Sequence, residues 1–175
     1  MKYIITVCSI LLIAIAVCGQ SASTLNSRGF RQAKQQHYEK AIQLFSAAIN
    51  ADPFFTDAYY NRALAYSKLQ QFDKSIADYS KAIDLRPHFT IAYNNRGADK
   101  HEQKDYAGAI ADYTKAIELD SSYARAYFNR GNSFYKLQQY QNAINDFNKA
   151  LKCKPGFKDA IINLSKAKEQ LKKEE

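Results

Sequence analysis

The chain repeats one pattern of residue types four times, at a constant interval of 34 residues. Each copy has an Arg followed by a small residue, then an aromatic residue, a small residue before Ile, a second aromatic residue and an Ala. The four copies start at Arg28-Gly29, Arg62-Ala63, Arg96-Gly97 and Arg130-Gly131. A constant interval of this length is typical of arrays in which each unit packs only on its neighbours. We therefore expect a solenoid of repeated units.

The second copy shows why each unit is expected to contain two helices. Apolar residues recur every three or four positions from Tyr59 to Leu69, and again from Phe72 to Leu85. This is the period of one face of a helix. Two glutamines separate the runs, and Pro87 ends the second because its ring disfavours a helical conformation at the preceding residue. Each copy is thus predicted to be a helix, a tight turn and an antiparallel second helix.

Small residues recur where the two helices of each unit are expected to cross. On the first helix the residue after the repeated Arg is Gly or Ala. On the second helix the small residues before Ile are Ala41, Ser75, Ala109 and Ala143. Helix axes that approach to about 8–10 Å leave little room for a larger side chain at the crossing. We expect the repeated aromatic residues to fill the space between one unit and the next.

The spacing resembles that of the tetratricopeptide repeat (TPR), as the second copy shows with Tyr59, Ala63, Tyr66, Tyr79 and Pro87. The resemblance implies an all-α fold, a TPR superhelix that is an α-α solenoid of antiparallel helix pairs. It places the repeats at residues 22–55, 56–89, 90–123 and 124–157. Residues 158–175 resemble the C-terminal helix and tail that cap such arrays. The first helices of such a superhelix line a concave groove that binds proteins or peptides.

Helical spacing selects the first-helix side chains that would face this groove. They are Asn26, Phe30, Tyr60, Asn61, Leu64, Lys68, Asn94, Asn95, His101, Arg125, Phe128, Asn129, Asn132 and Tyr135. Asn side chains suit hydrogen bonding to an extended peptide, and Tyr or Phe side chains suit apolar anchoring. The competing interpretation is that the repeated Asn-Arg pairs were copied by duplication and have no role in binding.

Some TPR proteins clamp the terminal carboxylate of cytosolic heat-shock chaperones. That clamp requires Lys and Asn in one unit, where this chain has Asn26 and Phe30. It requires Lys and Arg two units later, where this chain has Ile91 and Asn95. Only Asn61 matches the pattern, so the resemblance does not extend to this clamp.

Residues 1–19 are predicted to be a secretory signal peptide. A positive start at Met1-Lys2 precedes an uncharged apolar run, Tyr3–Cys18, and then small polar residues. The run is shorter than the ~20 residues that a membrane-spanning helix needs. Cleavage after Gly19 would give an exported chain, periplasmic or secreted. Two alternatives stay open, an uncleaved membrane anchor and a lipoprotein modified at Cys18.

The remaining cysteine, Cys153, occupies the position of Ala51, Leu85 and Leu119 in the other copies. We expect it to be a small buried hydrophobic residue. With only one cysteine outside the exported segment, no disulfide framework is predicted.

Composition and motifs argue against an enzyme. The three His are isolated, and no phosphate-binding loop, nucleophile elbow or metal motif occurs, so no cofactor, metal or catalytic residue is predicted. Asp78, Asp112 and Asp146 are interpreted as solvated positions of the second helices.

The formal net charge is +8, but acidic residues alternate with basic ones along the repeats, so a nucleic-acid partner is not expected.

The function predicted from the sequence is therefore a non-enzymatic scaffold that binds a protein or peptide of unknown identity outside the cytoplasm. The alternative is a structural or assembly subunit of an envelope or secretion complex, held at the membrane by its N-terminus.

The third copy departs from the others on its first helix, where Lys100 replaces the aromatic residue found as Tyr66 and Phe134. Its stem is expected either to snorkel toward water or to leave the packing thin. The third copy is thus predicted to be the least stable, with faster amide hydrogen exchange than the second and fourth copies. Equally slow exchange in all three would contradict this prediction.

Overall fold

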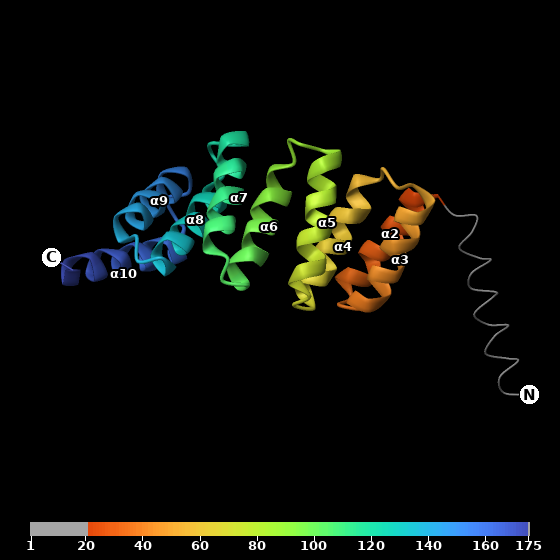
Figure 1. Cartoon of the computed structure of the whole chain (residues 1–175), viewed down its shortest axis with the longest axis horizontal. Helices are drawn as coiled ribbons and strands as arrows, with labels where there is room; N and C mark the ends of the chain where they lie inside the picture. Colours follow the sequence, from red (N-terminus) through yellow and green to blue (C-terminus); the bar gives the residue numbers. More distant parts are fainter. Residues whose placement is uncertain (1–20, 175) are drawn as a thin grey trace, which may run out of the picture. The chain divides into compact units, whose positions relative to one another are not determined.

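The computed structural model describes residues 21–174 of the chain as a succession of helices (Figure 1). They form two compact units divided after Leu85, and each unit is treated separately below. The predicted signal peptide and Cys18 lie outside the described residues. No strand occurs between residues 21 and 174, so the predicted all-α architecture is confirmed.

Unit 1 consists of two antiparallel helix pairs. Its helices are α2 (Ala22–Lys34), α3 (Tyr38–Ala51), α4 (Thr56–Lys68) and α5 (Phe72–Leu85). Consecutive helices pack together, and α2 also contacts α4, so the first helices of the two pairs are neighbours. A buried cluster of Leu25, Ala48, Ile49 and Ala58 joins the two pairs, which is the nearest-neighbour packing expected of a solenoid.

Unit 2 contains two further pairs and a final helix. These helices are α6 (Thr90–Glu102), α7 (Tyr106–Leu119), α8 (Ala124–Lys136), α9 (Tyr140–Cys153) and α10 (Lys158–Glu174). Helix α8 contacts both α6 and α10, so three helices of the first-helix type lie in a row. Ala167 of α10 is fully buried against Phe147 of α9, and α10 thereby covers the last pair.

The predicted crossing of the two helices in each pair is confirmed by burial. Ala41, Ser75, Ala109 and Ala143 are all fully buried. A Cβ added to Gly29 would lie 2.6 Å from Cε1 of Phe45, and one added to Gly131 would lie 2.7 Å from Cε1 of Phe147. In these copies the second aromatic residue therefore packs on the small residue of its own pair, and does not only fill space between units.

The turn inside each pair requires a left-handed residue that is never Gly. The residues concerned, with φ between 57° and 66°, are Gln36, Gln70, Lys104 and Gln138. A side chain with a Cβ is disfavoured in this conformation, and Gly is the usual residue there at helix ends.

Replacing Gln70 by Gly is expected to raise the free energy of unfolding by about 0.5–1 kcal/mol, because Gly adopts φ 57° without steric cost. Urea denaturation followed by circular dichroism measures the change. The adjacent Gln71→Gly is the control, since Gln71 has no positive φ and Gly there only adds freedom to the unfolded chain. A loss of stability in both variants would contradict the expectation.

Within residues 21–174, no helix combines the length and apolar character needed to cross a membrane.

Candidate functional site

The repeated Arg of unit 1 is fixed by a buried carboxylate. Arg62 donates from Nε to Oδ2 of Asp78 at 2.7 Å and from Nη2 to Oδ1 at 2.8 Å. Its Nη1 also donates to Oγ of Ser46 on the preceding α3, at 2.9 Å. The hydrogen bond to Asp78 is the main reason that the pKa of Arg62 is raised above its ordinary value. This Arg therefore joins three helices of the scaffold.

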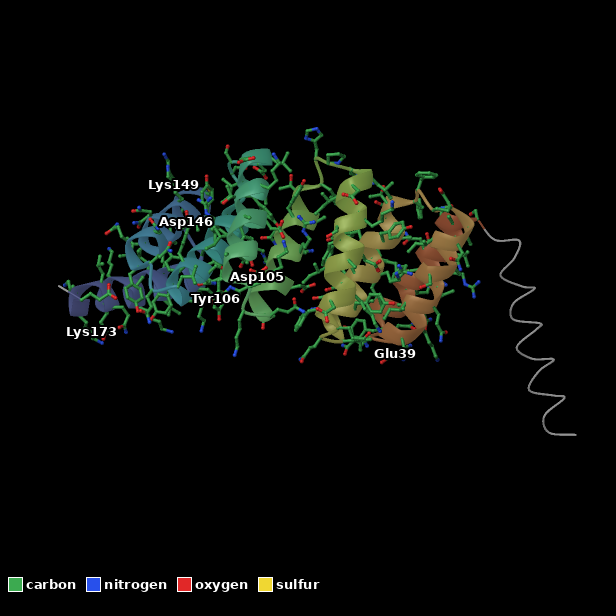
Figure 2. The ribbon with its side chains drawn as sticks, in the orientation of Figure 1. Glu39, Asp105, Tyr106, Asp146, Lys149 and Lys173 are labelled. Atoms are coloured by element: carbon green, nitrogen blue, oxygen red, sulfur yellow. The ribbon has the colours of Figure 1, made fainter. Side chains whose placement is uncertain are left out.

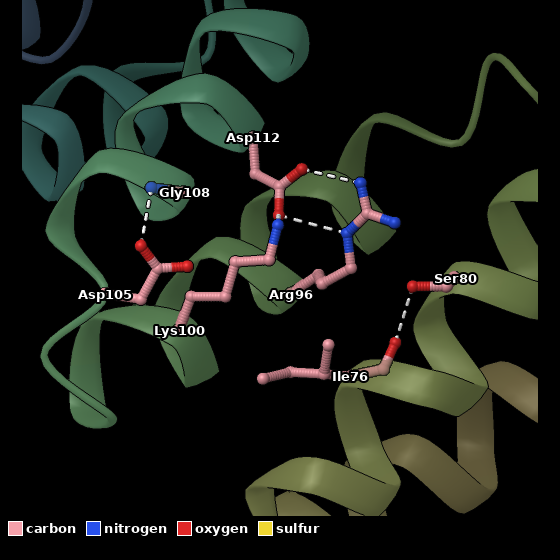
Figure 3. A network of polar contacts seen from close by, with 7 residues as sticks. All are labelled: Ile76, Ser80, Arg96, Lys100, Asp105, Gly108 and Asp112. Atoms are coloured by element: carbon pink, nitrogen blue, oxygen red, sulfur yellow. Dashed lines mark hydrogen bonds and ion pairs between the residues drawn. The ribbon is translucent and has the colours of Figure 1, made fainter.

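The same arrangement occurs twice in unit 2. Arg130 donates to both carboxylate oxygens of Asp146 at 2.8 Å, and its Nη1 donates to Thr114 of α7 at 2.9 Å. Arg96 binds Asp112 at 3.0 and 2.6 Å. Figure 3 shows that Lys100 approaches the same carboxylate, with Nζ 2.8 Å from Oδ2 of Asp112.

One sequence interpretation is corrected by these pairs. The Asp residues were expected to be solvated, yet Asp78, Asp112 and Asp146 are buried against Arg. Lys100, whose side chain keeps 22% exposure, pairs its amine with Asp112. The signal was present in the sequence, because Arg and Asp recur 16 residues apart in three copies. The predicted fast exchange of the third copy stays a prediction.

The Asn side chains predicted for the groove bond mainly to one another. Asn61 donates to Asn26 between α4 and α2 at 3.0 Å. Asn129 of α8 donates to Asn94 of α6, also at 3.0 Å, and Asn94 is only 2% exposed. These bonds tie neighbouring first helices together, which gives the repeated Asn a structural role and leaves Asn94 little surface for a ligand.

The predicted aromatic anchors differ in how they are packed. Phe128 lies between the rings of Phe147 and Phe157, with centroids 5.9 and 4.7 Å away. Tyr60 packs on Tyr79, its own second-helix aromatic, at 5.9 Å. Both are partly buried and support the core. Of the other predicted residues, Leu64 and Asn95 are half-buried, and Phe30, Lys68 and Arg125 are exposed.

Three of the predicted residues meet around one hollow of unit 2. The hollow has a volume of about 350 Å³ and is lined by His101, Asn132, Tyr135, Lys136, Asn163 and Lys166. They come from α6, α8 and α10, the row of first-type helices. Asn163, Lys136 and Lys166 were not predicted, because α10 was treated only as a cap and Lys136 lies at the edge of the helical face.

The walls of this hollow are held in place by contacts between the helices. Asn163 donates to Oδ1 of Asn132 at 2.8 Å. Nδ1 of His101 lies 2.8 Å from Oγ of the buried Ser133, and its ring meets the edge of Tyr106 at 5.0 Å. The ring of Tyr135 meets Tyr140 at 5.3 Å. The hollow is therefore a preformed surface with hydrogen-bonding, aromatic and cationic groups.

Comparison with known families now identifies the fold. A model described as TPR repeat matches residues 31–70 and 99–138, and a model described as tetratricopeptide repeat matches residues 56–89 and 124–157. Together they cover more than half of the chain. The chain is a tetratricopeptide repeat protein.

Solved structures agree with this TPR assignment. The crystal structure of MamA protein matches with a TM-score of 0.81 and 22% identity, over 87% of this chain and 83% of MamA. The first TPR of Spaghetti (RPAP3), bound to the HSP90 peptide SRMEEVD, matches at 0.65 and 28% identity, over 66% of this chain and 92% of that one. The Arabidopsis OM64 TPR domain matches at 0.64 and 29% identity, over 65% and 94%. Among curated protein sequences, none is significantly similar to this chain.

The TPR fold is that of scaffolds for protein interactions, and the described part of this TPR protein shows no metal-binding group. No set of three or more His, Cys, Asp and Glu side chains between residues 21 and 174 could hold a metal ion.

The expectation that Cys153 is buried is wrong, because Cys153 is exposed. It is the last residue of α9, where the helix leaves the core, and its Sγ lies 3.9 Å from the carbonyl oxygen of Ser121.

His101 is expected to make the stability of the TPR protein depend on pH. Burial is the main cause of its lowered pKa; Lys136 lowers it further and Glu102 opposes the shift. Because the unfolded state then binds a proton more readily than the folded state, falling pH favours unfolding. The stability that the neutral His101 side chain contributes to the folded state is fully present above the unfolded pKa of about 6.5. It declines as pH falls below that value.

Urea denaturation at about pH 7 and about pH 5 measures this effect in wild type and in His101→Gln. The variant is expected to lose less stability than wild type between the two values. His37 and His88 are present in both proteins, so the comparison isolates the effect of His101. Equal losses would show that His101 does not sense pH.

Proposed function

We propose that this TPR protein binds an extended segment of another protein on its first helices, and that it does so outside the cytoplasm. The observation that supports binding is the hollow of unit 2 lined by His101, Asn132 and Tyr135, which combines an aromatic wall with amide and imidazole groups. Such a mixture suits a peptide, whose backbone needs hydrogen bonds and whose side chains need apolar contact.

The peptide-bound RPAP3 relative supports the class of ligand, and the sequence argues for a different peptide here. Of the residues that the chaperone-carboxylate clamp requires, this chain has only Asn61. That residue donates to Asn26, so one of its hydrogen-bonding groups is already engaged. The proposed partner is therefore a protein segment recognised by unit 2 and not a chaperone terminus held by that clamp.

A displayed peptide library selected on the full chain tests this binding. Lys136→Glu combined with Lys166→Glu changes two exposed side chains at the hollow and is expected to weaken selected peptides about tenfold or more. Lys149→Glu with Lys152→Glu is the matched control, with the same charge change on exposed positions of α9. Figure 2 labels Lys149. Equal peptide binding by wild type and both double variants would show that the hollow does not bind the peptide.

Phe128→Ala is unsuitable for this experiment. Its ring packs against Phe147 and Phe157, so the substitution would disturb the core as well as any ligand.

The exported location rests on residues 1–19 alone. Intact-mass analysis of the chain from its native host is expected to show cleavage after Gly19. Retention of Met1 would contradict a cleaved signal peptide, and a lipid adduct lost on Cys18→Ser would instead support the lipoprotein alternative.

A further inference from the structure

The peptide site proposed for unit 2 continues into a second hollow. This hollow, of about 140 Å³, is lined by Ala98, His101, Glu102, Tyr113, Asn129 and Asn132. His101 and Asn132 line both hollows, so the two lie side by side across α6 and α8. Together they are called the unit 2 groove below. Lys136 and Lys166 line only one part of this groove, and Glu102 lines only the other.

We propose that the unit 2 groove selects a protein segment with two opposite charges, a Lys or Arg that binds Glu102 and an Asp or Glu that binds Lys136 and Lys166. The inference rests on the proposed peptide binding and specifies which segments bind. Complementary charges discriminate between partners, because a like charge at either position repels the wrong segment.

Glu102 is a departure from the repeat at the end of a helix. The last residue of the first helix is Lys34, Lys68 and Lys136 in the other three pairs. Lys is favourable there because the C-terminus of a helix carries a partial negative charge, and Glu is unfavourable for the same reason. The third copy alone therefore has an acid at a position where that acid does not stabilise its own helix. A cation on the bound segment would give this acid a partner.

The two ends of the groove act on one shared side chain. Glu102, Lys136 and Lys166 are exposed, whereas His101 is half-buried. Burial is the main cause of the lowered pKa of His101, but Glu102 raises that pKa and Lys136 lowers it. Both charges therefore lie near the ring that the two hollows share, and a segment lying over His101 would feel both.

The fold sets the spacing between the two charges. Glu102 and Lys136 end α6 and α8, which contact each other, and α10 with Lys166 contacts α8 on the next step. Packed helices have axes about 8–10 Å apart, and an extended segment advances about 3.3–3.6 Å per residue. The cation and the acid of the bound segment are therefore expected to be about three to five residues apart.

Peptides selected from a displayed library on the full chain test this charge pattern. Wild type is expected to enrich peptides with opposite charges about three to five residues apart. Each selected peptide is then synthesised with its cation changed to Glu or its acid changed to Lys. Glu102→Lys should weaken the parent peptide about three- to tenfold and should bind the Glu-substituted peptide better than wild type does. Lys136→Glu with Lys166→Glu should do the same for the Lys-substituted peptide.

Glu118→Lys is the matched control for Glu102→Lys. It makes the same charge change at an exposed position of α7 that lines neither hollow, so it should leave peptide affinity within about twofold. Glu102→Lys introduces the Lys of the other copies, so its midpoint of thermal unfolding should equal or exceed that of wild type. Weaker peptide binding by this variant would then not result from unfolding.

The outcomes separate this inference from the proposed function. Selected peptides without paired charges, or peptides that bind Glu102→Lys and Glu118→Lys equally well, would overturn the charge pattern and leave peptide binding in place. A library that yields no peptide for wild type would overturn the proposed function and the charge pattern with it.

Discussion

Replacing Asp112 by Ala is expected to lower the free energy of unfolding by about 2–4 kcal/mol. Asp112 is 4% exposed and accepts from Arg96 at 2.6 Å while lying 2.8 Å from Nζ of Lys100 (Figure 3). Its loss removes one carboxylate from two cations that are largely withdrawn from water. The side chains of Arg96 and Lys100 keep 17% and 22% exposure, so partial hydration limits the loss.

Urea denaturation followed by circular dichroism measures this change. Glu118→Ala is the matched control on α7, because Glu118 forms an exposed ion pair with Lys115, and it should leave stability almost unchanged. Equal effects of the two substitutions would show that the buried pairs contribute no more than surface charges.

Replacing Phe147 by Ala is expected to cost about 3–5 kcal/mol, the range for removing a buried aromatic ring. Phe147 is fully buried and packs in one cluster with Ala143, Ile144 and Ala167. Its ring also lies against Gly131 and Phe128. The ring therefore joins α8, α9 and α10, and its removal leaves a cavity in the centre of unit 2.

Phe54→Ala provides the contrast, because Phe54 is 78% exposed in the turn between α3 and α4. That variant should unfold at nearly the wild-type urea concentration. A small effect of Phe147→Ala would mean that the cavity collapses and that α10 is held by other contacts.

Helix pairing and the crossing residues could be predicted because they follow from local rules. A 34-residue interval with three- and four-residue apolar spacing specifies two helices per unit, and small residues mark where they approach. The positions of Gly131 and Ala143 in the closely packed crossing of α8 with α9 agree with that reasoning. No long-range information was needed, since each unit packs on its neighbours.

The candidate site was predicted less completely. Helical spacing placed His101, Asn132 and Tyr135 on one face, and the structure brings them around one hollow. The same reasoning could not show that Asn94 is buried and accepts from Asn129, because that bond joins residues on different helices. It also missed Asn163, since the contribution of α10 depends on how the last helix docks.

The sequence by itself determined the repeat and the all-α fold, because the periods of helices and repeats are visible along the chain. The 16-residue spacing of Arg and Asp is visible in the sequence, but only the tertiary structure showed that these charged groups pair inside the protein. Asp78, Asp112 and Asp146 look like ordinary surface acids until their helices bring them to Arg62, Arg96 and Arg130. Burial and pairing are properties of contacts between helices, and a pattern of residue types specifies them only after those helices are placed together.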